Sequence, residues 1–263
     1  MLSTALVAAG DGRMNLMSNY KQRQRGLYQA KQKEPFSISR SKIDMFLECP
    51  RCFYLDRRLG LGRPSMPGWS LNSAVDQLLK NEFDLLRKKG EAHELMQKFK
   101  IEAIPYEHPD LDQWRNNFVG KQYLHKPTNL LIFGAIDDVW INKAEELLIV
   151  DYKATSTEKE ISLEDEWKQG YKKQMEVYQW LFKEDGFKVG KTGYFVFANA
   201  GKNREKFDGR LEFELTIIPY EGDGTWIGPT LTEIKQVLDS DKLPEAGESC
   251  EYCEYRKLTG KKV

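Results

Sequence analysis

The apolar residues of this chain follow two different spacings. In four segments they recur every three or four residues, which predicts amphipathic helices over 41–48, 70–89, 163–185 and 225–240. In four others they run together or alternate, which predicts strands over 129–141, 146–154, 191–200 and 210–220. Residues 101–128 show no regular spacing apart from one short helix around 110–118. Helices that flank a small mixed sheet predict an α/β (α+β) domain.

Composition and charge limit the class of protein. The chain has 263 residues, of which 40% are hydrophobic and 12% aromatic, enough to bury a full core. Its 40 basic and 40 acidic residues cancel, so net charge neither supports nor excludes a nucleic-acid partner. No apolar run approaches the ~20 residues of a membrane span, and the first residues lack the basic flank of a secretory signal. We therefore expect a cytoplasmic protein.

The two ends of the chain differ in character from the middle. The first 37 residues carry a basic excess and few large apolar side chains. We expect residues 1–37 to be a disordered extension, either a solvated tail or an arm that contacts phosphates. One folded domain is expected over 38–258, and 259–263 form a tail.

Charged residues interrupt the two apolar runs that form the predicted hairpin. Asp137 lies in the first run, and Asp151 and Lys153 lie in the second. A turn at 142–145 would place Asp137 opposite Val150 and diagonal to Asp151. Two carboxylates this close repel each other unless a cation lies between them, which favours Mg²⁺ or Mn²⁺.

The second strand of the hairpin would also place an amine beside the ion. Asp151 and Lys153 are two residues apart and share one face of the strand, while Tyr152 projects from the other. A bound ion can activate a water for phosphodiester cleavage, and Lys153 can orient that water or neutralise developing charge. The alternative is that both aspartates are edge residues and the lysine pairs with one of them.

The stretch "GAIDD…LLIVDYKATS", followed by "QMEVY", resembles the PD-(D/E)XK nuclease superfamily in its RecB-like branch. That branch has a G-x-x-D element, a D/E-x-K element and a Q-x-x-x-Y helix, which Gln174 and Tyr178 fill on one helical face. The resemblance implies a restriction-endonuclease-like core in which this pair contacts substrate or metal waters; the alternative for the pair is plain packing. The implied catalytic residues are Asp137, Asp151, Lys153, Gln174 and Tyr178.

One position departs from the family pattern. The family often has a histidine upstream, and here "LNSAVDQLL" places Asp76 where that histidine would align. An aspartate can ligate a hard cation, or it can be a solvent-facing helix residue. His93, His108 and His125 match no motif and are expected to be ordinary surface or loop residues. The residues assigned to the metal are Asp137, Asp151, Tyr152 and Asp76.

All four cysteines fall in two C-x-x-C pairs, "CPRC" with Cys49 and Cys52 and "CEYC" with Cys250 and Cys253. Two such pairs with none left over indicate a metal site, either zinc or an iron–sulfur cluster. A site built from both pairs would join the N- and C-terminal segments and remove much unfolded-state entropy.

The resemblance extends to these cysteines. AddB-type helicase–nuclease subunits and CRISPR adaptation nucleases bind a 4Fe–4S cluster with one cysteine before the nuclease core and three after it. Here Thr259 stands near the expected last cysteine, and Cys52 supplies the fourth thiol instead. The resemblance therefore favours a 4Fe–4S cluster, with Zn²⁺ as the alternative.

These observations predict a Mg²⁺- or Mn²⁺-dependent deoxyribonuclease, acting as an exonuclease on DNA ends or single strands. The chain lacks a G-x-x-x-x-G-K-[ST] motif, so any helicase or integrase-type partner would be a separate protein. The alternative is a non-catalytic nucleic-acid-binding or scaffold protein with the same fold.

Overall fold

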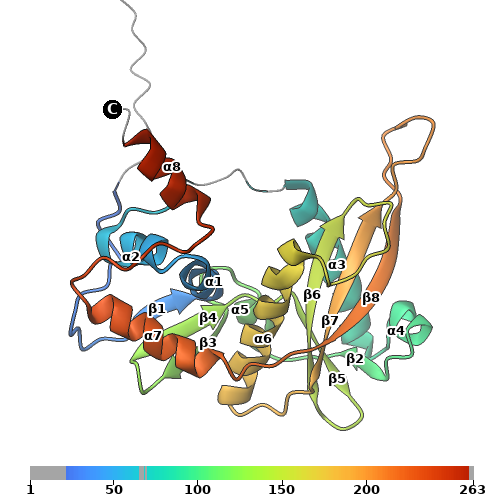
Figure 1. The fold of residues 1–263 in the computed structure, drawn as a ribbon. Helices are drawn as coiled ribbons and strands as arrows, with labels where there is room; N and C mark the ends of the chain where they lie inside the picture. Colours follow the sequence, from blue (N-terminus) through green and yellow to red (C-terminus); the bar gives the residue numbers. More distant parts are fainter. Residues whose placement is uncertain (1–21, 65–67, 69, 261–263) are drawn as a thin grey trace, which may run out of the picture.

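Two β-sheets organise the residues described by the computed structural model, 22–64, 68 and 70–260 (Figure 1). The larger sheet has the order β2 (Ala103–Pro105), β5 (Asp138–Asn142), β6 (Leu147–Thr155), β7 (Thr192–Ala200) and β8 (Phe213–Glu221). The smaller has the order β1 (Phe36–Ser39), β4 (Leu130–Gly134) and β3 (Lys121–His125). In the larger sheet β6 and β7 are parallel and the other pairs are antiparallel, so this sheet is mixed.

Helices cover both faces of the larger sheet (Figure 1). On one face lies α6 (Gln169–Glu184), after the short 3₁₀ turn η1 (Glu166–Lys168). On the other lie α3 (Ser70–Lys89) and α4 (Glu94–Lys98). The remaining helices are α1 (Arg40–Glu48), α2 (Pro50–Leu59), α5 (Leu111–Trp114), α7 (Ile227–Asp239) and α8 (Glu251–Thr259). The predicted mixed α/β domain is confirmed.

The central strand β6 sends alternate side chains into two different cores. Val150 and Tyr152 are buried in the core that α3 and α4 cover, and Ile149 is buried in the core on the α6 side. Because side chains alternate along a strand, Asp151 and Lys153 share the α6 side with Ile149. This alternation separates the two charged residues from the tyrosine between them, as predicted.

The strand predicted over 129–141 is wrong as a single strand. It divides into β4, which joins the smaller sheet, and β5, which joins the larger one. Asp137 lies at the end of the link between them, immediately before β5. The apolar run is continuous across the link because Ile136 is itself fully buried, so hydrophobicity alone did not reveal the break.

The hairpin of β5 and β6 is confirmed, but its register differs by one position from the prediction. Asp138, and not Asp137, faces Val150. The side-chain oxygen of Asn142 accepts two backbone N–H groups of the turn, at 3.0 and 2.9 Å, and this turn sets the pairing. If this register is continued by one residue, Asp137 lies directly opposite Asp151. We had predicted a diagonal position, which is farther away.

Three strands lie where the pattern predicted none: β1, β2 and β3. They contain four, three and five residues. Strands this short leave too few alternations for a period of two to stand out. They are stabilised by pairing with other strands, which a single sequence does not show.

Part of the expected N-terminal extension packs against the domain. Tyr28 and Phe36 are 3% and 6% exposed, and their ring centroids lie 5.1 Å apart in an edge-on contact. Packed structure therefore begins before residue 38, while residues 1–21 lie outside the described part of the chain. At the other end α8 runs to Thr259, and residues 261–263 also lie outside it.

A membrane-crossing helix would need a long apolar stretch. Within the described ranges, no helix combines the necessary length and apolarity.

Candidate active site and four-cysteine site

Side chains from α3, β6, α6 and the link between β4 and β5 meet at an open cleft of about 320 Å³. Asp76 comes from α3, Asp137 from the link, Lys153 from β6 and Tyr171 from α6. Residues far apart in sequence are therefore brought together as the hairpin predicted, and α3 contributes the upstream aspartate.

Among Asp76, Asp137 and Asp151, Asp151 is the most deeply buried, with 0% of its surface exposed. The ammonium of Lys153 contacts Oδ2 of Asp151 as its ion-pair partner, while Oδ1 has no hydrogen-bond partner among the described residues. Burial raises the pKa of Asp151 to about 6; Lys153 acts against this shift and the negative charge of Asp137 adds to it. Buried carboxylate oxygens without hydrogen bonds are costly, so Asp151 is well suited to bind a cation.

A chain of hydrogen bonds links Lys153 to α6. Its Nζ donates to Gln174 Oε1 at 3.3 Å, and Gln174 Nε2 donates to the Tyr178 hydroxyl at 3.1 Å. The same ammonium lies 4.6 Å from the centroid of the Tyr171 ring. Burial would lower the pKa of Lys153, but the neighbouring carboxylates, Asp151 first, outweigh it and raise the pKa. Lys153 therefore stays protonated and is held in place.

Asp137 is tied to both sides of the cleft. Its Oδ2 accepts the backbone N–H of Tyr152 at 2.9 Å, and its Oδ1 lies 3.1 Å from Lys80 Nζ. Asp76 Oδ2 lies 2.8 Å from the same ammonium. Burial raises the pKa of Asp76, and the charge of Asp137 acts in the same direction. Asp76 therefore lies beside Asp137 at the cleft, with 32% of its side chain exposed.

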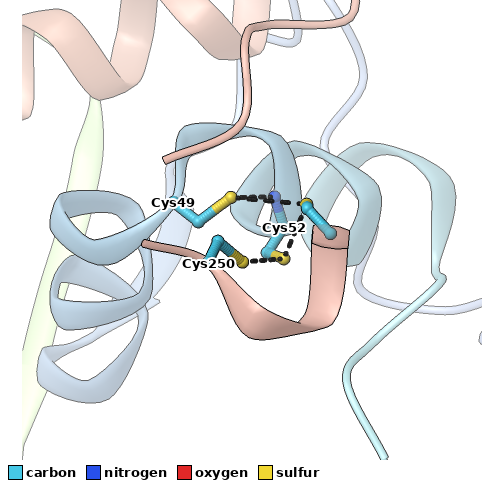
Figure 2. Close-up of side chains that lie close together, drawn as sticks. Cys49, Cys52 and Cys250 are labelled. Carbon is cyan, nitrogen blue, oxygen red and sulfur yellow. Dashed lines mark hydrogen bonds between the residues drawn. The ribbon is translucent and has the colours of Figure 1, made fainter. Parts of the chain in front are cut away.

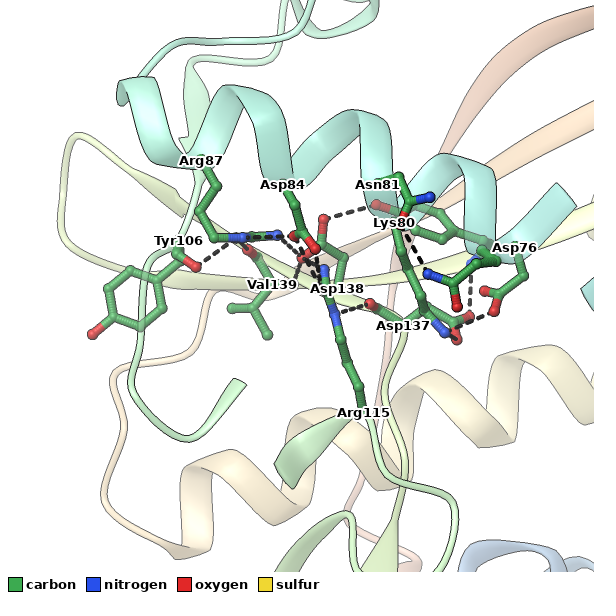
Figure 3. Close-up of polar contacts among 12 residues, drawn as sticks. Asp76, Lys80, Asn81, Asp84, Arg87, Tyr106, Arg115, Asp137, Asp138 and Val139 are labelled. Atoms are coloured by element: carbon green, nitrogen blue, oxygen red, sulfur yellow. Dashed lines mark hydrogen bonds and ion pairs between the residues drawn. The ribbon is translucent and has the colours of Figure 1, made fainter. Parts of the chain in front are cut away.

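Asp138 belongs to a separate network on the α3 side of the sheet (Figure 3). It is fully buried, forms ion pairs with Arg87 and Arg115, and accepts the Tyr152 hydroxyl at 2.7 Å. Arg115 Nε also donates to the backbone carbonyl of Asp137 at 2.9 Å. Tyr152, which we assigned to the metal, donates its hydroxyl to Asp138 and its backbone N–H to Asp137, so its side chain points away from the cleft carboxylates and the assignment to the metal stays a prediction.

Gly134 has a physical reason to lack a side chain. A Cβ there would lie 2.6 Å from Cε1 of Tyr178, so the aromatic ring rests directly on the glycine backbone. Tyr178 is 3% exposed and fills this space. The glycine of the G-x-x-D element therefore lets α6 approach the site closely.

Two cations of the site were not found from the sequence. Lys80 contacts Asp76 and Asp137 and lies four residues after Asp76, a helical spacing that was a usable signal. Burial would lower the pKa of Lys80, but both carboxylates outweigh it and raise the pKa. Arg40, at the start of α1, pairs with Asp44 and lies near enough to Tyr178 and Asp151 to share their electrostatics. No motif marked it.

The histidines have structural roles. His93 is only 3% exposed, so the expected surface position is wrong: its Nδ1 accepts the N–H of Leu95 at 3.0 Å and begins α4. His108 stacks on Trp114 with ring centroids 4.2 Å apart. His125 makes a hydrogen bond of 2.8 Å with Thr128.

The four cysteines form one cluster that joins the two ends of the described chain (Figure 2). The sulfurs of Cys49, Cys52, Cys250 and Cys253 all lie within 4.8 Å of one another. Three of the Sγ–Sγ distances are 3.6–3.7 Å. The predicted joining of N- and C-terminal segments through these thiols is confirmed, and such a donor set fits a soft metal ion or an iron–sulfur cluster.

Local structure prepares this cluster for metal. Cys49 caps α2, and its Sγ accepts the N–H groups of Cys52 at 3.4 Å and Gly247 at 3.3 Å. Burial would raise the pKa of Cys49, but these donors outweigh it and lower the pKa to about 7. A Cβ at Gly247 would lie 2.1 Å from the carbonyl oxygen of Glu48, so glycine permits the close approach of the two segments.

Comparison with known proteins identifies a family for most of the chain. The family model described as "PD-(D/E)XK nuclease superfamily" matches residues 71–258. Among solved structures, the one described as "Crystal structure of SSO0001" is similar at 16% identity with a TM-score of 0.33, over 89% of this chain and 90% of that chain. No curated protein matches the chain significantly.

Proposed function

We propose that this chain, which belongs to the PD-(D/E)XK nuclease superfamily, is a divalent-metal-dependent nuclease with its centre at Asp137, Asp151 and Lys153. One observation carries the proposal. Asp151 is completely buried, its Oδ1 accepts no hydrogen bond from the described residues, and its Oδ2 is in contact with the ammonium of Lys153. A fold does not keep such a carboxylate for stability, because the same volume of apolar side chain would cost less.

The residues present fit a hard divalent cation. Asp137 and Asp151 are the expected ligands, and Asp76, which shares the Lys80 ammonium with Asp137, is the candidate for a third. The three carboxylates would have to draw together around the ion, because among the described residues only the four cysteines already lie close enough to hold one as a group. Oxygen donors of this kind suit Mg²⁺ or Mn²⁺. When bound, the ion supplies an activated water and stabilises charge on the phosphoryl oxygens.

The other polar residues act around that centre. Lys153 presents a fixed positive charge where charge develops on the phosphate, and Gln174 fixes its position through a hydrogen bond of 3.3 Å. Tyr178 holds Gln174 in turn at 3.1 Å. Gln174 and Tyr178 therefore act as positioning residues for the lysine in addition to any contact with substrate.

We infer that the substrate is DNA, taken at ends or as single strands, from the resemblance to the RecB-like branch. The open cleft supports this assignment, because an extended strand needs access from the side. Exonuclease action and a separate helicase or integrase-type partner rest on the same resemblance.

The cysteine spacing favours one tetrahedral ion over a cluster. Four ligands about 2.3 Å from a single zinc lie about 3.8 Å from one another, close to the three separations of 3.6–3.7 Å and compatible with a cysteine cluster whose sulfurs all lie within 4.8 Å of one another. In a 4Fe–4S cluster each thiolate binds a different iron, so the sulfurs lie farther apart. We therefore infer structural Zn²⁺ here, in place of the cluster that the family resemblance favoured.

Cleavage of labelled single- and double-stranded DNA and of RNA, with Mg²⁺ or Mn²⁺, tests the nuclease assignment. We expect metal-dependent cleavage of DNA by the wild type and none by Asp151→Ala, with Glu205→Gln, an exposed loop acid, as the matched control. Preferential cleavage of RNA would overturn the substrate class. Binding of nucleic acid without cleavage under any metal would show a non-catalytic protein.

A further inference from the structure

Lys80 places a second ammonium inside the carboxylate cluster. Its Nζ lies 2.8 Å from Asp76 Oδ2 and 3.1 Å from Asp137 Oδ1, and 15% of its side chain is exposed (Figure 3). One turn of α3 separates it from Asp76, so both side chains project from the same helical face. The ammonium therefore bridges two of the three carboxylates assigned to the metal.

A divalent ion and this ammonium compete for the same oxygens. An ion bound to carboxylate oxygens sits about 2.1 Å from each of them. Lys80 Nζ already lies within hydrogen-bond distance of one oxygen from each of two acids. Two cations that share ligands at these distances repel each other strongly, because little water separates them.

The balance of charge indicates what the displaced ammonium does. Asp76, Asp137 and Asp151 carry three negative charges, and Lys80 and Lys153 carry two positive charges. One divalent ion turns this net negative site into one with a single positive charge, which matches one phosphodiester group. Without Lys80 the loaded site would be neutral and would attract the phosphate less.

We propose that Lys80 competes with the divalent ion for Asp76 and Asp137, and that metal binding moves its ammonium onto the phosphate of the nucleic acid. The inference rests on the proposed function, because it takes these carboxylates as metal ligands. It couples the two ligands: the metal frees Lys80 for the phosphate, and the phosphate holds Lys80 away from the metal. Lys80 thereby keeps metal affinity low until nucleic acid is bound.

Calorimetric titration of Mn²⁺ into the purified protein tests the competition without any cleavage. Mn²⁺ is chosen because thiolates prefer softer metals, so the cysteine cluster will not report. We expect Lys80→Met to bind Mn²⁺ at least tenfold more tightly than the wild type. Lys88→Met, an exposed lysine of the same helix, should bind as the wild type does, and Lys80→Arg should keep the weak affinity.

Binding of a labelled single-stranded oligonucleotide in Ca²⁺, measured by fluorescence anisotropy, tests whether Lys80 contacts the phosphate. Lys80→Met is expected to bind the strand at least threefold more weakly, although it binds metal more tightly. Should Lys80→Met fail to fold by circular dichroism, Lys80→Gln removes the same charge and takes its place.

The possible failures are distinguishable. Unchanged or weaker Mn²⁺ binding by the neutral variant, or unchanged binding of the oligonucleotide, would overturn the role of Lys80 and leave the nuclease assignment standing. A wild type that binds no Mn²⁺, with or without oligonucleotide, would overturn the metal site itself.

Discussion

The carboxylate site and the cysteine site are built in opposite ways. The acids lie on or beside regular elements, β6, α3 and the start of β5, and the protein supplies their counter-ions, Lys80 and Lys153. The cysteines lie at helix starts, where Cys49 caps α2 and Cys250 stands at the N-cap position of α8, and they join segments 198 residues apart that also meet where Arg51 donates to the carbonyl of Pro244. The first site is supported by the fold, whereas the second helps to hold the fold together. Removing a ligand should therefore cost activity at one and stability at the other.

The largest effect is expected at Asp151. Asp151→Asn keeps the shape of the side chain but removes the charge that holds the ion, so cleavage should fall by about a thousandfold or more. At neutral pH and without divalent metal the melting temperature should rise, because the charged form of Asp151 costs about 2–3 kcal/mol there and the amide of asparagine does not. Initial rates with labelled DNA check the effect on cleavage, and a thermal melt of the same sample checks the effect on stability. Full activity would remove Asp151 from the chemistry.

The cysteine site should show the reverse. Cys250→Ser removes one of four metal ligands and releases the closure of a loop of almost 200 residues, with a loss of about 3–5 kcal/mol in unfolding free energy. Cleavage per folded molecule should stay within about threefold of the wild type. Elemental analysis and denaturant unfolding measure the effect; a stable, colourless variant without metal would contradict the role.

Adjacent aspartates offer the sharpest contrast. Asp138→Asn leaves Arg87 and Arg115 as partly unpaired buried charges and should destabilise the protein by about 3 kcal/mol. Asp137→Asn removes an acid from a crowded cluster and should abolish cleavage with little loss of stability. Chemical denaturation of the two variants side by side tests this division; equal loss of stability would mean that the two acids share one structural role.

The pH dependence of stability isolates the buried acid. The raised pKa of Asp151, about 6 in the folded protein, means that the folded state holds its proton more tightly than the unfolded state. The tighter proton binding contributes fully to the free energy of unfolding below pH 4, the ordinary pKa of an aspartate. This contribution of about 2–3 kcal/mol is lost as the pH rises through 6. Without added divalent metal, the free energy of unfolding of the wild type minus that of Asp151→Asn should fall by this amount between pH 4 and pH 7. A difference in unfolding free energy that does not change with pH would contradict the raised pKa of the buried Asp151 carboxylate.

The sequence predicted most of what is local and little of what depends on distant partners. The hairpin and the cysteine cluster followed from spacing alone, and the ion pair of Lys153 with Asp151 is the contact that the alternative interpretation allowed. The short strands β1, β2 and β3 did not follow from spacing, because each is stabilised by pairing with another strand. The break between β4 and β5 was hidden by the buried Ile136, and the register was set by one asparagine in the turn.

The site was predicted to a similar extent. The motif identified its acids and Lys153, but Arg40 carries no signal because its role depends on how α1 packs against α6. Lys80 was readable only after Asp76 was known to face the cleft. The sequence does not show that Asp138 takes the hydroxyl of Tyr152, because that contact depends on which acid of the link enters β5.

The central claim is that Asp137 and Asp151 share one divalent ion. Crystals grown with Mn²⁺ and measured on both sides of the manganese absorption edge give its position directly. We expect one anomalous peak within bonding distance of both carboxylates, with Asp76 as a third ligand or as a holder of its water. A peak bound to neither aspartate, or no peak at saturating Mn²⁺, would contradict the account.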